Sequence, residues 1–250
     1  MMFDPPDYSV IEGTEAAFRN FYPTRRRTPP PPGTVDVTVP VAEGVEIGCR
    51  FYPGDPSGPN ILYFHGNGET VPDYDDVAPL FTKLGMNVFV ADYRGYGFST
   101  GSPSFPTMLS DAHLILAAFM KVCEGKRFVM GRSMGGHSAV ELAAHHPDEL
   151  KGVILESSAP FITRLLEDLE PAKAAELEQR HLEKIRAITI PTLAIHGEGD
   201  ELIPIERAVA FQESLTTPQK RLERIPNAGH NDILWVGMDQ YLGAVRAFVS

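Results

Sequence analysis

The chain has 250 residues, of which 43% are hydrophobic and 22% are charged, a composition typical of a folded globular protein that excludes the disordered and fibrous classes. With 33 acidic and 22 basic residues, the formal net charge is −11, so the field of the chain repels the phosphates of nucleic acids and anionic lipid surfaces. Cys49 and Cys123 form no metal or redox motif, and no stretch approaches the roughly 18 apolar residues of a membrane span. We therefore expect a cytoplasmic protein with no nucleic-acid partner and no metal site.

The first 33 residues differ in composition from the rest of the chain. A short apolar-periodic stretch around Ala16, Phe18 and Phe21 predicts an N-terminal helix, and the proline run at 29–32 predicts a stiff linker after it. The three arginines at 25–27 are expected to form a solvated basic turn. We assign this segment no function and place the folded domain at residues 34–250.

The domain begins with two strand-like stretches and continues as an alternation of strands and helices. Residues 35–39 and 45–52 predict an antiparallel pair at one sheet edge. The later apolar runs lie at 61–64, 87–91, 127–130, 153–155 and 192–195, and the segments of helical period at 74–84, 107–122, 134–145, 205–215 and 239–249. This order predicts βαβ units, and hence an α/β fold whose parallel strands are buried on both faces.

About thirty residues, at 158–187, interrupt this alternation and predict a small helical cap. Its first part carries an apolar stripe at helical spacing that includes Phe161, Leu165 and Leu169. The stripe is either part of the core or the roof of an acyl pocket. The second part, at 172–186, is charged and is expected to face solvent.

The strongest catalytic signal is the sequence GRSMG at 131–135, which lies between an apolar run and a helical segment. A serine at a sharp strand-to-helix turn exposes its hydroxyl above the sheet, and glycines two residues to either side remove the Cβ atoms that would clash there. The free amides and the dipole of the following helix favour negative charge at this point. We therefore predict that Ser133 is a nucleophile.

A serine nucleophile needs a base, and the base needs a carboxylate that fixes its tautomer. Asp200 follows an apolar strand and His230 also follows a strand, each in a polar loop, the position at which ligand sites occur in open α/β sheets. We predict His230 as the general base and Asp200 as the acid that orients it. Glu156, at the end of the run after the nucleophile helix, stays open as an alternative acid.

Acyl transfer also needs two N–H donors for the oxyanion of the tetrahedral intermediate. The amide of Met134 directly follows the nucleophile, and the amide of Asn67 lies in a turn whose glycines allow the backbone to point its amides inward. We predict these two amides as the oxyanion hole. Tyr96, Phe98 and Trp235 are the predicted walls of the substrate pocket.

Five motifs, in this order, resemble those of the α/β-hydrolase superfamily: HGNG at 65–68, DYRGYGFSTGSPS at 92–104, GRSMGG at 131–136, HGEGDELIP at 196–204 and NAGHND at 227–232. The resemblance covers about residues 35–250 and is greatest to the small-cap branch, which includes the abhydrolase-domain depalmitoylases and bacterial esterase-like proteins. It implies an eight-stranded, mostly parallel sheet flanked by helices, and acyl-serine chemistry without a cofactor. Those depalmitoylases carry an N-terminal cysteine cluster for lipidation, which has no counterpart before Cys49, so no stable membrane anchor is carried over.

The function expected from these residues is hydrolysis of a carboxylic ester or thioester of a small to medium acyl substrate. The small cap and the acidic composition favour a neutral substrate. Two alternatives stay open, a peptidase of the same fold and a non-catalytic ligand-binding module. The residues do not distinguish ester, thioester and amide substrates.

Overall fold

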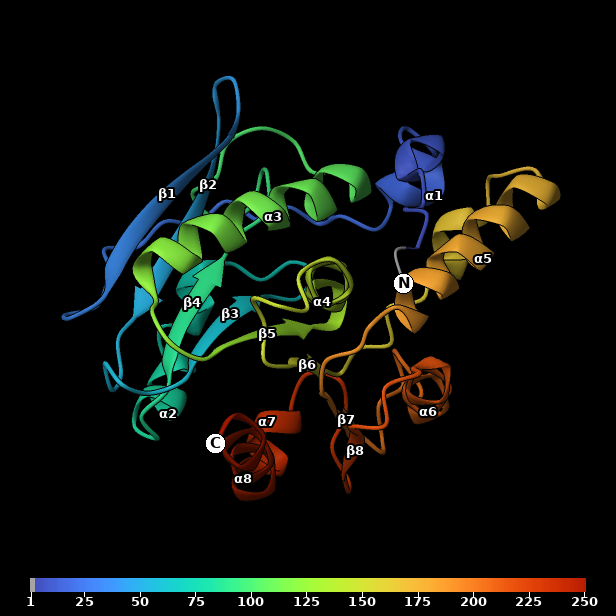
Figure 1. Ribbon diagram of the computed structural model, residues 1–250. Helices are drawn as coiled ribbons and strands as arrows, with labels where there is room; N and C mark the ends of the chain where they lie inside the picture. Colours follow the sequence, from blue (N-terminus) through green and yellow to red (C-terminus); the bar gives the residue numbers. More distant parts are fainter. Residues whose placement is uncertain (1–2) are drawn as a thin grey trace.

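The computed structural model describes residues 3–250, which form one eight-stranded sheet with helices on both faces (Figure 1). The strands are β1 (Val35–Ala42), β2 (Val45–Tyr52), β3 (Asn60–Phe64), β4 (Asn87–Ala91), β5 (Arg127–Arg132), β6 (Val153–Glu156), β7 (Thr192–Gly197) and β8 (Lys220–Ile225). Their order across the sheet is β1-β2-β4-β3-β5-β6-β7-β8. β2 is antiparallel to β1 and β4, and every other neighbouring pair is parallel. The predicted eight-stranded, mostly parallel sheet is confirmed.

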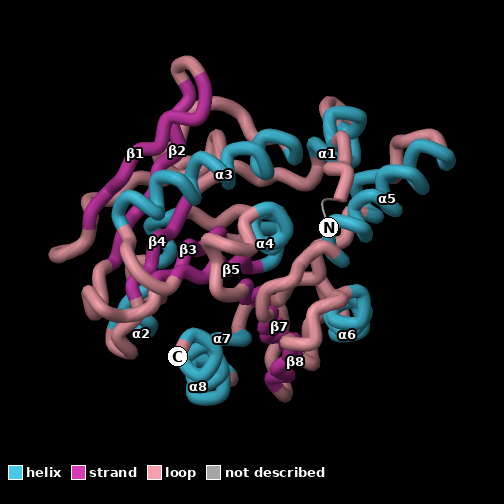
Figure 2. The backbone as a smooth tube through the Cα atoms, in the orientation of Figure 1, coloured by secondary structure: helices cyan, strands magenta, loops and turns pink. Residues whose placement is uncertain are grey.

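Helices cover the two faces of this sheet (Figure 2). The α-helices are α1 (Glu15–Phe18), α2 (Ala78–Thr82), α3 (Phe105–Val122), α4 (Gly136–His145), α5 (Pro171–Arg186), α6 (Ile205–Ser214), α7 (Ile233–Val236) and α8 (Met238–Val249), and the 3-10 helices are η1 (Tyr8–Ile11), η2 (Val71–Tyr74), η3 (Ser133–Gly135) and η4 (Thr163–Leu166). One layer contains α3, α4 and α6, and the other contains α2, α7 and α8. No helix within residues 3–250 is long and apolar enough to cross a membrane.

The central strands are buried on both faces, as their apolar runs predict. Along β3, Leu62 and Phe64 pack into the core under α3 and α4, whereas Ile61 and Tyr63 pack into the core under α2 and α8. Because successive side chains of a strand point to opposite faces, a strand between two helical layers needs apolar residues at every position. This explains why the strands are easier to find in the sequence than the helix boundaries.

Two predicted helices are shorter than their periodicity suggests. The segment predicted as a helix at 74–84 contains only α2, which follows the separate turn η2. Pro72 and Pro79 each lie in a first turn, because proline has no backbone N–H and starts a helical segment more readily than it continues one. The helix predicted at 134–145 begins at Gly136, since the preceding residues form η3.

The cap consists of η4 and α5 and lies beside the N-terminal segment (Figure 1). The expectation that residues 172–186 face solvent is wrong for one side of α5, where Leu177, His181 and Lys184 are buried. The hydroxyl of Tyr8 lies 2.7 Å from Nδ1 of His181. Cap and N-terminal segment therefore share one core, and α1 is a single turn within that packing.

The segment that precedes β1 contacts the domain at several residues between 20 and 28. The amide of Tyr22 donates to Oδ1 of Asn67 at 2.9 Å, and that of Arg26 donates to the carbonyl oxygen of Gly97 at 3.2 Å. The arginines expected to form a solvated turn have partners: Arg25 contacts the carbonyl oxygen of Ser99, Arg26 pairs with Asp73, and Arg27 lies 5.5 Å from the centre of the Phe98 ring. The stiff linker expected at 29–32 stays a prediction, but the residues directly before it make contacts with the domain.

Candidate active site

Ser133 directly follows β5, and its backbone φ of 50° lies in the left-handed region that residues other than glycine rarely adopt. The glycines around it leave no room for a side chain. A Cβ on Gly131 would lie 2.4 Å from the carbonyl oxygen of Gly135, and a Cβ on Gly135 would lie 2.2 Å from that of Phe64. Such strained backbone costs about 1–3 kcal/mol and clusters at functional sites. The turn therefore has the strain and the close packing of a nucleophile elbow.

The structure brings Ser133, His230 and Asp200 together in one hydrogen-bonded chain. Nε2 of His230 lies 3.0 Å from Oγ of Ser133, and Nδ1 of His230 lies 2.8 Å from Oδ2 of Asp200. These residues come from three loops at the carboxyl ends of β5, β8 and β7. Because the parallel strands end at the same edge of the sheet, residues 97 positions apart meet there.

The environment of Asp200 favours its ionised form. Burial raises the pKa of this carboxyl, but hydrogen bonds with His196 and His230 and the amide of Ile203 lower it more, so the pKa lies well below its ordinary value. The amide of Ile203 donates to Oδ1 at 2.8 Å. An ionised Asp200 accepts a hydrogen bond from Nδ1–H of His230, and in this tautomer Nε2 carries no hydrogen and can accept the hydroxyl proton of Ser133.

Glu156, the alternative acid, has other partners. Its Oε2 accepts hydrogen bonds from the hydroxyls of Tyr63 and Tyr241, both at 2.6 Å, and its Oε1 lies 3.3 Å from Nε of Arg132. Within residues 3–250 it makes no hydrogen bond to His230. The structure thus places Asp200, and not Glu156, beside the imidazole.

Arg132 connects the loops of the site and was missed by sequence reasoning. Its Nη2 donates to the carbonyl oxygen of His230 at 3.2 Å and to Oδ1 of Asn231 at 2.8 Å, and its Nη1 pairs with Glu69 at 2.5 Å. Glu69 in turn accepts from the amide of Gly66 at 2.7 Å. The available signal was a charged residue at the end of an apolar strand, directly before the serine.

The two predicted oxyanion donors lie in separate loops. Met134 is in the first turn of η3, where backbone amides have no intrahelical acceptor. The amide of Asn67 donates no hydrogen bond to any residue that the structure describes. The loop before it is fixed by His65, whose carbonyl oxygen accepts from the hydroxyl of Tyr93 at 2.6 Å. Both amides are therefore available to a ligand.

The side chain of Asn67 holds the N-terminal segment over the site. Its Oδ1 accepts from the amide of Tyr22 at 2.9 Å and from the hydroxyl of Tyr96 at 2.7 Å, and its Nδ2 donates to the carbonyl oxygen of Asn20 at 2.9 Å. We call residues 19–22 the strap. The strap lies more than 100 positions from Ser133 in the chain, and no sequence motif marks it.

A cavity of about 300 Å³ opens beside Ser133 and is lined by the strap, the cap and the start of α6. Its lining residues are Arg19, Asn20, Phe21, Tyr22, Asn67, Phe105, Ser133, Met134, His137, Ser158, Ala159, Pro160, Phe161, Arg164, Leu165, Leu202, Ile203 and Arg207. The apolar stripe of the cap contributes to this lining, so it roofs the cavity as well as packing against the core.

The predicted pocket walls Tyr96, Phe98 and Trp235 do not line this cavity, and that prediction is wrong. Tyr96 is fully buried and supports Asn67. Phe98 packs under the guanidinium of Arg27. Trp235 is 55% exposed and borders a separate depression next to Glu156.

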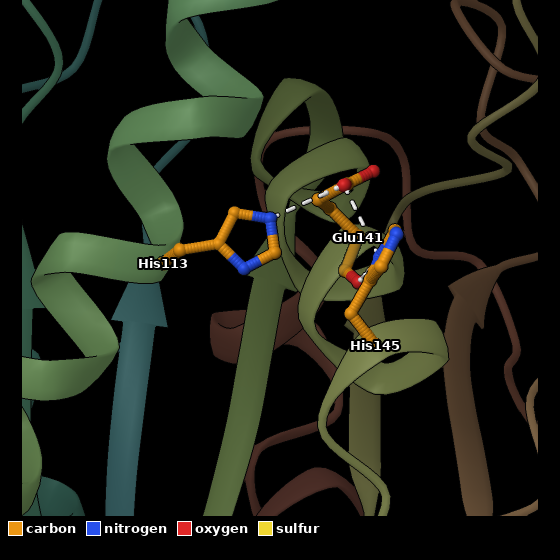
Figure 3. A group of neighbouring side chains, drawn as sticks. All are labelled: His113, Glu141 and His145. Carbon is orange, nitrogen blue, oxygen red and sulfur yellow. Dashed lines mark hydrogen bonds and ion pairs between the residues drawn. The ribbon is translucent and has the colours of Figure 1, made fainter. Parts of the chain in front are cut away.

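One group of side chains away from the triad could hold a metal ion. His113 on α3 and Glu141 and His145 on α4 have donor atoms within 4.8 Å of one another (Figure 3). Nζ of Lys184 already lies 2.7 Å from Oε2 of Glu141. Burial raises the pKa of Glu141, but Lys184 and His113 lower it more, to about 2. The ammonium balances the carboxylate, so this group is explained as an ion-pair network that joins α3, α4 and α5.

Comparison with known proteins places these features in a family. The family Hydrolase_4, described as "Serine aminopeptidase, S33", matches residues 56–184. The chain is 31% identical over 216 residues to Alpha/beta hydrolase domain-containing protein 17B of Homo sapiens, which covers 84% of this chain and 73% of that protein. It is also 31% identical over 189 residues to Protein bem46 of Schizosaccharomyces pombe, which covers 70% of this chain but only 62% of that protein.

Solved structures share the fold at lower sequence identity. The Pyrococcus furiosus esterase Pf2001 superposes with a TM-score of 0.71 at 20% identity, over 92% of this chain and 97% of that one. At this level of identity, the likeness establishes the arrangement of strands and helices.

Proposed function

The chain belongs to the α/β-hydrolase superfamily, and from this premise we propose that it is a serine hydrolase that cleaves a carboxylic ester or thioester of a small to medium acyl group. The observation that carries the proposal is the hydrogen-bonded chain from Ser133 through His230 to Asp200, beside a cavity large enough for a small ligand. The order serine, histidine, carboxylate along this chain supports the proposal, because acyl transfer needs a nucleophile, a base and an orienting acid in that order.

In the proposed reaction, the hydroxyl of Ser133 attacks the acyl carbonyl while Nε2 of His230 takes its proton. The amides of Asn67 and Met134 donate hydrogen bonds to the resulting oxyanion. The imidazolium then protonates the leaving alcohol or thiol, and an acyl-serine remains. Water gives a proton to His230 and attacks the acyl-serine, after which the second intermediate releases the acid and Ser133 recovers its proton.

Labelling with a fluorophosphonate probe tests the nucleophile. We expect the native chain and Ser110→Ala, an exposed serine on α3, to take the label and to hydrolyse p-nitrophenyl butyrate. Ser133→Ala and His230→Ala should lose both properties, because the first lacks the nucleophile and the second its base. A folded native chain that takes no label and cleaves no ester or thioester would refute the proposal and favour the binding module.

The description of the family raises aminopeptidase activity as a second candidate. A peptidase of this kind binds the ammonium group of its substrate, for which a carboxylate is the usual partner. Among the described residues that line the cavity there is no Asp or Glu. We therefore expect aminoacyl p-nitroanilides to be cleaved far more slowly than the butyrate ester.

A further inference from the structure

The charge at the cavity is opposite to the charge of the chain. Acidic residues outnumber basic ones by 33 to 22 in the sequence. The described residues that line the cavity nevertheless include Arg19, Arg164 and Arg207, and no carboxylate. The field inside a cleft depends on the residues that line it more than on the net charge of the protein. The cavity is therefore basic although the protein is acidic.

Two of these arginines have no partner in the described part of the protein. Arg19 pairs with Glu15 at 2.7 Å on the surface. Arg164 and Arg207 make no ion pair with any residue between 3 and 250, and their guanidinium groups donate no hydrogen bond within that part of the chain. The guanidinium of Arg207 lies 5.8 Å from the centre of the Phe161 ring, a contact that holds a cation over an apolar wall. Their hydrogen-bond donors are thus available to a ligand.

The rest of the cavity suits an acyl chain. Phe21, Phe105, Met134, Phe161 and Leu165 supply apolar and aromatic surface beside Ser133. A cavity of mostly apolar walls with a few charged groups at fixed positions orients an amphiphilic ligand.

His137 adds a polar group without a charge. It lines the cavity, and its Nδ1 is buried and has no partner among the described residues. Burial, together with the nearby ammonium of Lys184, lowers the pKa of His137 to about 3, so the imidazole is neutral at pH 7. The arginines therefore carry the charge of this cavity.

We infer that the substrate is an acyl ester or thioester with a negatively charged group, a carboxylate or a phosphate, which Arg164 and Arg207 bind while the acyl carbonyl lies at Ser133. This inference rests on the proposed hydrolase function. Guanidinium groups bind both anions through paired hydrogen bonds. It differs from the expectation of a neutral substrate, which depended on the small cap and the acidic composition.

The test compares esters that differ in charge and little else. Mono-p-nitrophenyl glutarate and p-nitrophenyl valerate have acyl groups of five carbons, and only the first ends in a carboxylate. Butyryl glycerol 3-phosphate carries its charge on the alcohol side, and monobutyrin is its uncharged counterpart. We expect kcat/KM to be at least tenfold higher for the charged member of one pair than for its neutral member. The pair with this preference then shows whether the enzyme favours a carboxylate on the acyl side or a phosphate on the alcohol side.

Arginine variants assign the effect to the cavity. The preference for charge is the ratio of kcat/KM for the charged ester to kcat/KM for the neutral ester. Arg164→Gln and Arg207→Gln should each lower this ratio about tenfold, because each variant loses one charge-assisted hydrogen bond to the anion. Arg186→Gln is the matched control, since Arg186 is an exposed arginine at the end of α5 that does not line the cavity; it should leave the ratio unchanged.

The two hypotheses fail in different ways. Hydrolysis of the neutral esters with no preference for either charged ester would overturn the inference and leave the hydrolase function standing. The inference is overturned in the same way if Arg164→Gln and Arg207→Gln change the ratio no more than Arg186→Gln does. Absence of both fluorophosphonate labelling and hydrolysis in the native chain would instead remove the hydrolase function.

Discussion

Arg132→Gln should lower both stability and turnover, because Arg132 is the common partner of three loops of the site. Its side chain is 11% exposed and pairs with Glu69, 28% exposed, and Glu156, 5% exposed. Removing one partner of a buried ion pair destabilises a protein by about 3–5 kcal/mol. Since Glu69 stays partly hydrated, we expect about 3 kcal/mol, measured as the free energy of unfolding in urea.

The effect on catalysis comes from the lost hydrogen bond between Nη2 of Arg132 and the carbonyl oxygen of His230. A displacement of a catalytic group by about 1 Å lowers rates roughly 10²-fold, so kcat should fall by this order while KM changes little. Arg132→Lys should recover part of the stability but little of kcat, because an ammonium cannot reach all these partners at once. Arg127→Gln, at the other end of β5, is the control. An Arg132→Gln enzyme that is destabilised but retains its kcat would refute the positioning role.

Three further variants test the strain, the ion pair and the strap. Ser133→Gly should be about 1 kcal/mol more stable than Ser133→Ala, because glycine adopts a φ of 50° without strain. Equal free energies of unfolding for the two variants would show that the turn stores no backbone strain. The folded pKa of Glu141, about 2, lies below its ordinary 4.5, so its contribution to stability is complete above pH 4.5 and is lost as the pH falls towards 2. Glu141→Gln should therefore flatten the fall in unfolding free energy between pH 5 and 3, and an unchanged slope would exclude the pair with Lys184 as its source. Asn67→Ala keeps the backbone amide of residue 67 but removes the hydrogen bonds of its side chain to Tyr22 and Asn20, and leaves the Tyr22 amide only the hydroxyl of Tyr96. Hydrogen exchange at the amide of Tyr22 should therefore accelerate and kcat/KM should fall about tenfold; unaltered exchange would contradict this account of the strap.

The fold could be predicted because its central strands are short and buried on both faces. The run at 87–91 coincides with β4, and the runs at 61–64 and 127–130 lie within β3 and β5. Helix starts were less predictable, because hydrophobic period does not distinguish a 3-10 turn from the first turn of an α-helix. The contacts of the N-terminal segment could not be predicted for a different reason: its hydrogen bonds go to residues far away in the sequence, such as Asn67 and Gly97.

Within the site, too, the catalytic residues could be predicted from the sequence and the shape of the cavity could not. Ser133, Asp200 and His230 each follow a strand in a local pattern that a sequence displays, and the common edge of a parallel sheet brings such positions together. The pocket walls depend on which distant segments lie over that edge, and no local pattern specifies this. Tyr96 lies close to the site, but its hydroxyl bonds to Asn67 and its side chain does not line the cavity. The strap forms the wall at this point.

The inferred anionic substrate also has to approach a protein whose net charge is −11. At physiological ionic strength the Debye length is about 8 Å, so charges elsewhere on the surface are largely screened from an ester in the cavity. Arg164 and Arg207 line the cavity and pair with no described residue, so a ligand bound there would lie well within one Debye length of their charges. Under the inferred mode of binding, the local charge therefore sets the affinity, whereas the net charge of the protein acts mainly on the association rate at low salt. An acidic chain and an acidic substrate are compatible for this reason, and the composition of a protein is a poor guide to the charge that its active site accepts.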